Sequence, residues 1–155
     1  ATPVQAQKKD YLSQTEANRV RDSETLAERI KLFISFAADR IKKLQYELAR
    51  AGDDARAVER VNNLIINYTN CVDDAADLID LGTEKQQDIR QAVKDMQTRA
   101  PGFLGYLKGL EAPGAKMSAY KDDLDDAIDA TNDAIKSADE ATKELAPPPV
   151  RRRPA

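Results

Sequence analysis

The chain has no histidine and no tryptophan, and it holds one cysteine among its 155 residues. Without histidine, the Glu-x-x-His pairs that bind two irons inside a helical bundle cannot form, and neither can a nucleophile that histidine activates. Cys71 has no second cysteine for an internal disulfide, so it is either a buried thiol or one half of an intermolecular bridge. These absences predict a protein that is not an enzyme and that uses no cofactor or metal.

Long apolar runs and phosphate-binding glycine motifs are missing as well. No segment approaches the roughly 18 consecutive apolar residues of a membrane span, so no transmembrane segment is predicted. The glycines near Pro101 match neither a Walker loop nor a dinucleotide fingerprint. The net charge of −3 does not indicate nucleic-acid binding. The charge is uneven, however, because residues 1–52 carry a net +3 and residues 121–146 a net −6.

Charge and helical periodicity are what the chain has in abundance. Charged residues make up 33% of it, a composition typical of long helices rather than sheets. Apolar residues recur at three- and four-residue spacing in four runs, over 27–48, 58–79, 89–110 and 117–145. We therefore predict an all-α protein: an up-down-up-down antiparallel four-helix bundle with an extra N-terminal helical segment and a disordered Pro/Arg C-terminal tail.

Helix breakers between these runs predict where the helices end. Gly52 with Asp54, and Gly82 with Thr83, each supply a glycine stop followed by a polar N-cap, and "EAPGAK" at 111–116 separates the last two helices. We expect helices at about 13–50, 54–81, 84–110 and 117–145, with a flexible N-terminus at 1–12 and a disordered tail at 147–155.

The start of the first helix has two interpretations. Ser13 with Glu16 and Thr25 with Glu28 both match the capping-box pattern. Either a short helix at 13–22 precedes the main helix, or the main helix starts early. The apolar phase continues from Val20 to Ala27, so both interpretations stay open.

The stretch "RAPGFLGYLKGLEAPGAK" at 99–116 holds four of the six glycines. The apolar phase crosses Pro101 without a slip, which predicts a helix kinked there, with Gly102, Gly105 and Gly109 facing away from the core. Lowered local stability suggests either a tolerated kink or a docking segment. The residues proposed for docking are Phe103, Leu104, Tyr106 and Leu107.

A second candidate surface lies on the first helix. Leu32 and Phe36 point to the side opposite the seam, and Tyr46 lies farther along that side. Large exposed apolar residues of this kind usually have a cover. The cover is either the N-terminal segment, through Tyr11, Leu12 and Val20, or else a second subunit or a protein partner. We favour the intramolecular cover.

Two acidic ridges are candidates for weak cation binding or for attracting a basic partner. Asp122, Asp126, Asp129 and Asp133 recur along one face of the last helix, and residues 73, 77 and 80 recur likewise in the second. The calcium-loop pattern fails for lack of its glycine. A solvated outer face is therefore the favoured interpretation.

Function is predicted only at the level of class. The segment "ERIKLFISFAADRIKKLQYELA" is similar in style to small exported bacterial helical proteins of unknown function, a likeness that assigns no residue a role. The opening "ATPVQAQ" is typical of a chain after signal-peptide removal, which predicts export to the periplasm or medium.

We expect a non-catalytic protein-interaction or structural module of the cell envelope or secreted fraction, which binds an unknown protein partner or associates with itself. The alternative is a bundle that binds a ligand or cation through its acidic faces or a pocket near Pro101. Peripheral membrane contact through the basic tail ranks last.

Overall fold

The computed structural model describes residues 11–50, 54–111 and 117–147 of the chain. Within those ranges every regular element is helical, which confirms the all-α class. The elements are α2 (Gln14–Asp22), α3 (Leu26–Arg50), α4 (Ala55–Glu84), α5 (Arg90–Leu110), the short 3-10 helix η1 (Ser118–Tyr120) and α6 (Lys121–Glu144). Residues 1–10 of the predicted flexible start, 112–116 of the "EAPGAK" connection and 148–155 of the predicted tail lie outside the described residues. The predicted flexibility is wrong for residues 11 and 12, because Leu12 is buried and the Tyr11 hydroxyl donates to Asp74.

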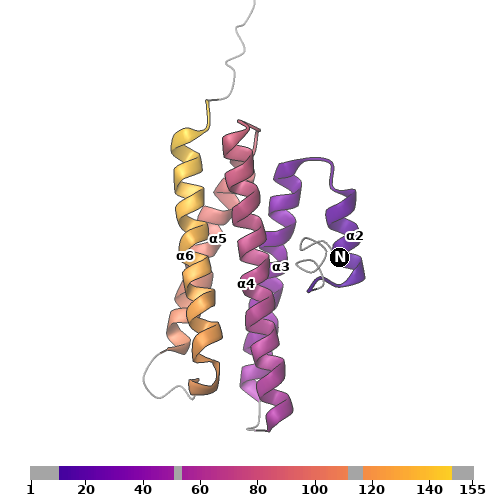
Figure 1. Ribbon diagram of the computed structural model, residues 1–155, viewed down its shortest axis with the longest axis vertical. Coiled ribbons are helices and arrows are strands. Elements are labelled where there is room, and N and C mark those ends of the chain that lie inside the picture. The colour runs from indigo at the N-terminus through magenta and orange to yellow at the C-terminus, as the bar shows by residue number, and fades with distance from the viewer. Residues whose placement is uncertain (1–10, 51–53, 112–116, 148–155) are drawn as a thin grey trace, which may run out of the picture.

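Five α-helices pack against one another (Figure 1). The close pairs among the long helices are α3 with α4, α4 with α6, α6 with α5, and α5 with α3. Helices α4 and α5 follow each other in the chain without forming one of these close pairs. The short helix α2 folds back beside α3, outside the group of four long helices.

The apolar seams that the sequence predicts form one continuous core. Its largest fully buried side chains come from all four long helices: Ile30, Ile34, Leu44, Val61, Ile65, Tyr68, Val72, Ile79, Met96, Leu107 and Leu124, with Ile89 just before α5. Burying an aliphatic side chain of this size contributes about 1.5–3 kcal/mol. Tyr68 is fully buried and satisfies its hydroxyl with Thr131 Oγ1 at 2.6 Å, and Phe103 packs edge-on against its ring.

The two interpretations of the first helix are resolved in favour of a separate short helix. Ser13 caps α2 in a complete capping box with Glu16, and α2 ends at Asp22. Thr25 Oγ1 then accepts the Glu28 backbone N–H at 3.1 Å at the start of α3. The helix therefore breaks at residues 23–25, between the extended backbone of Ser23 and the cap at Thr25, although the apolar phase runs through.

The predicted stop at Gly82 and cap at Thr83 are wrong. Both residues are buried inside α4, which continues to Glu84, and α5 begins only at Arg90. A Cβ on Gly82 would lie 2.8 Å from Ile89 Cδ1 and 3.0 Å from Leu26 Cδ2. The absence of a side chain at Gly82 lets Ile89 and Leu26 pack closely against α4. The chain reverses direction after α4 at Gln86, which has a φ of 52°.

The prediction for the glycine-rich helix is confirmed in its register. Helix α5 passes through Pro101 and buries Met96, Ala100, Phe103 and Leu107. Gly102, Gly105 and Gly109 are exposed, and a Cβ on any of them would meet open space. These glycines therefore serve no close packing between helices; the kink itself stays a prediction.

Candidate functional site

Charge is divided between two pairs of helices. Helix α6 carries nine acidic and three basic residues, and α4 carries six acidic and two basic residues. Helix α3 carries six basic and three acidic residues, and α5 four basic and one acidic. Because α4 packs on α6 and α3 packs on α5, the bundle has an acidic side and a basic side. The sequence shows the charge of each segment, but only the packing puts like segments together.

A shallow groove of about 430 Å³ runs between α4 and α6 on the acidic side. The charged side chains that line it are Asp73, Asp77 and Asp80 from α4, and Asp133, Lys136 and Glu140 from α6. A neighbouring hollow of about 270 Å³ extends the groove toward the ends of both helices, past Glu84 and Glu144. We call these eight residues the acidic groove.

The acidic groove joins the two ridges that the sequence singled out, but only in part. Of the four candidates on the last helix, Asp133 alone lines it, while Asp122, Asp126 and Asp129 are exposed residues outside its lining. No group of three or more carboxylate, thiolate or imidazole side chains arranged to hold a metal occurs among the described residues. The groove is therefore an extended negative surface rather than a convergent ligand set.

Leu32 and Phe36 are not available as an interaction face, because the intramolecular cover that the sequence analysis favoured is present. Phe36 is only 3% exposed and Leu32 is half-buried, while Leu12 and Val20 of the N-terminal segment are buried and Arg19 of α2 lies over the Phe36 ring. Tyr46 alone is exposed, at 58%, and Arg50 stacks on its ring. It borders a second shallow groove, between α3 and α4, of about 430 Å³.

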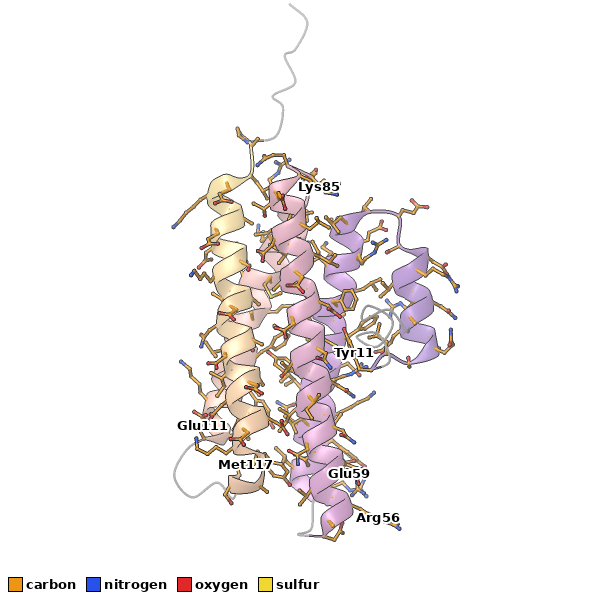
Figure 2. The ribbon with its side chains drawn as sticks, viewed as in Figure 1. Tyr11, Arg56, Glu59, Lys85, Glu111 and Met117 are labelled. Carbon is orange, nitrogen blue, oxygen red and sulfur yellow. The ribbon has the colours of Figure 1, made fainter. Side chains whose placement is uncertain are left out.

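Polar contacts hold α2 in this position. The Arg40 guanidinium donates to both carboxylate oxygens of Glu16, at 2.5 and 2.7 Å, and Arg40 is only 5% exposed. The Tyr11 hydroxyl donates to the carboxylate of Asp74 on α4, and Figure 2 shows Tyr11 between α2 and that helix. The Arg19 guanidinium lies 5.9 Å from the centre of the Phe36 ring. Together these contacts tie the N-terminal segment to α3 and α4.

Ionisation follows from these contacts. The hydrogen bonds from Arg40 hold the pKa of Glu16 below its ordinary value, since they favour the carboxylate. Burial raises the pKa of the Cys71 thiol to about 12. Cys71 is fully buried, which matches the first of its two predicted states, and its thiol stays protonated at neutral pH.

Sequence reasoning missed the Arg40–Glu16 pair. Glu16 was assigned to the capping box, and it does accept the Ser13 backbone N–H at 3.0 Å. The same Oε1 atom also accepts from Arg40, which lies 24 positions along the chain. No local spacing connects these positions, so only the folding back of α2 brings them together.

The predicted docking segment divides into buried and half-buried residues. Phe103 and Leu107 are buried in the core, so they are not available for docking, whereas Leu104 and Tyr106 are half-buried at its margin. A hollow beyond the C-terminal end of this segment has Leu110, Met117 and Leu124 in its lining. It lies at the end of α5, away from Pro101, so it does not match the predicted pocket near the kink.

Comparison with known protein families, with curated proteins and with solved structures finds no match for this chain. Among the described residues, no helix has both the length and the apolar character needed to span a membrane. Export of the protein stays a prediction.

Proposed function

We propose that this chain is a non-catalytic interaction module whose acidic groove binds a lysine- or arginine-rich segment of a partner polypeptide. The separation of charge between the α4/α6 pair and the α3/α5 pair is the observation that supports the proposal. We further propose that the four long helices form an up-down-up-down bundle in which the α4–α5 turn crosses a diagonal. This arrangement would keep the two acidic helices adjacent.

The physical basis is a negative field along one side of the molecule. Five carboxylates face the wider part of the groove and Lys136 is the one cation there. Surfaces of one sign steer an oppositely charged partner and set its orientation, and their effect falls with ionic strength. A polypeptide with several spaced positive charges matches an extended row of carboxylates better than a single ion does, because the row does not converge on a point.

The test measures the binding of a labelled peptide of alternating arginine and serine by fluorescence anisotropy. The groove variant combines Asp77→Asn, Asp80→Asn, Asp133→Asn and Glu140→Gln. The control variant removes the same number of charges from the other end of α6, with Asp122→Asn, Asp123→Asn, Asp126→Asn and Asp129→Asn. We expect about a tenfold or greater loss of affinity in the groove variant and about a twofold loss in the control.

Three outcomes would contradict this proposal. Equal losses in both variants would mean that only the overall negative charge of the protein matters and that the groove is not a binding site. Absence of binding to the unmodified protein at low ionic strength would remove the proposal altogether. An affinity that does not weaken as salt increases would also contradict it, because these carboxylates face solvent.

A divalent cation is the second candidate ligand, favoured by the same row of carboxylates. Calcium needs six to eight oxygen atoms around one point, and oxygens from the two ridges would have to converge. Calorimetric melting with and without millimolar calcium tests this candidate. A rise in melting temperature that disappears in the groove variant would favour the cation over the peptide, and an unchanged melting temperature would exclude it.

A further inference from the structure

The connection between α2 and α3 differs from the other helix connections. Residues 23–25 are Ser-Glu-Thr and contain neither glycine nor proline. By contrast, 51–53 contains Gly52, 111–116 contains Pro113 and Gly114, and the turn after α4 uses a positive φ at Gln86. Serine, glutamate and threonine have helix propensities well above those of glycine and proline. The sequence Ser-Glu-Thr therefore allows either a break between two helices or one continuous helix, with a small difference in free energy.

The apolar phase supports a continuous helix across this connection. Val20, Ala27, Ile34 and Ile41 are spaced seven residues apart. If residues 14–50 formed one helix, Val20 would extend the buried stripe of α3 beyond the end of the bundle. The local sequence is therefore compatible with two states, and tertiary contacts select the folded-back state seen here.

Those contacts are both apolar and polar. Leu12 and Val20 are buried, and Tyr11 and Ala17 pack against the core at its margin. The polar attachments include the Arg40–Glu16 ion pair, the Tyr11–Asp74 hydrogen bond and the contact of Arg19 with Phe36. Beneath α2, Phe36 is almost fully buried under Arg19, and Phe33 packs edge-on against its ring. Release of α2 would uncover Phe36, so this surface needs another cover.

We propose that α2 is an exchangeable arm, and that the α2 of a second copy of this chain occupies the same surface in a swapped dimer. In the open state α2 continues α3 as one helix, and two such helices pack side by side about a two-fold axis. Since α2 folds back beside α3 in the single chain, the α2 of a two-fold-related copy meets α3 in the same orientation. The contacts that α2 makes within one chain then form between the two chains, so the swapped dimer loses none of them.

Reversing the charges of the Arg40–Glu16 ion pair gives a test of arm exchange. Opposite charges can then meet only if α2 is exchanged between two different chains. The Glu16→Arg variant and the Arg40→Glu variant each place like charges together and cannot close on themselves. In a mixture, one interface of the swapped heterodimer pairs the two reversed charges and the other pairs native Glu16 with native Arg40. We expect a heterodimer to form in the mixture, measured by native mass spectrometry, with at least a tenfold excess over either homodimer.

The double variant E16R/R40E is the control, because it restores opposite charges within one chain and should remain largely monomeric. A mixture of the two single variants that contains only monomers, with the double variant folded, would overturn the proposal. A heterodimer that also forms after residues 1–24 are deleted from both chains would overturn it too, since the arm would then play no part.

The hinge gives an independent test if either single variant fails to fold. Ser23 Oγ donates to the Val20 carbonyl and accepts from Arg29, and Thr25 caps α3. Combining Ser23→Ala with Thr25→Ala removes these contacts and raises helix propensity, so the dimer fraction should rise about tenfold. Thr98→Ala, which alters an exposed threonine bonded within α5, should leave it unchanged. No rise in the hinge variant would contradict the proposal, and the acidic groove is not involved in either result.

Discussion

The interface of α2 with the bundle and the interface among the four long helices rest on different physical effects. The long helices bury continuous rows of aliphatic side chains, and their main internal polar pair is Tyr68 with Thr131. Helix α2 buries one side chain of its own and relies on an ion pair and a tyrosine hydroxyl. Apolar burial contributes stability in proportion to area, whereas a buried ion pair contributes mainly through the cost of breaking it. The bundle should therefore be the stable unit and α2 the separable one.

Removing core volume should have the largest effect on stability. Ile65→Ala deletes a fully buried side chain and should lower the free energy of unfolding by about 2–5 kcal/mol, because the cavity cannot collapse completely. Ile66→Ala, at the next position but 42% exposed, is the matched control and should cost well under 1 kcal/mol by urea unfolding. Similar losses in the two variants would contradict the assignment of the core face of α4.

The glycines of α4 and α5 should respond in opposite directions. Gly82→Val would push a side chain into Ile89 and Leu26, and should lower the free energy of unfolding by about 1–3 kcal/mol. Gly105→Ala faces open space in an α-helix and should raise that free energy by about 0.5–1 kcal/mol. Thermal unfolding of both variants measures the contrast. Stabilisation by Gly82→Val would refute its role in close packing.

The smallest effect on global stability, and the sharpest on α2 alone, should come from Glu16. Its pKa is lowered in the folded state, so its contribution is complete at pH values above the ordinary pKa of glutamate and is lost as pH falls through the folded value. Amide hydrogen exchange of residues 14–22 should accelerate over that acid range, after correction for intrinsic rates, while exchange in α4 stays slow. Glu16→Gln should accelerate exchange in α2 about tenfold at neutral pH and abolish its acid dependence. An acid dependence that survives in Glu16→Gln would assign the effect to another group.

Sequence reasoning located the core residues well and the surface features poorly. Heptad spacing alone placed Phe103 and Leu107 on the buried side of α5 and Gly102 on the exposed side, because helical geometry relates neighbours within one turn. The same reasoning put Phe36 on the outer side of its helix and favoured the N-terminal segment as its cover, and α2 does lie over that ring. It could not derive the contacts themselves, because no local spacing connects α2 with α3. Gly82 was misjudged for a related reason, since its role comes from Leu26 and Ile89 rather than from its own helix.

Local pattern by itself determined that this chain is helical, where most of its helices begin and end, which side of each long helix is buried, and that histidine chemistry is excluded. These properties follow from short-range spacing and composition, which the chain carries with it whether folded or not. Only the tertiary structure decided that α2 closes over Phe36, that Glu16 meets Arg40, and that α4 and α6 place their carboxylates along one groove. Those features depend on contacts between distant positions, which the packing of the helices selects.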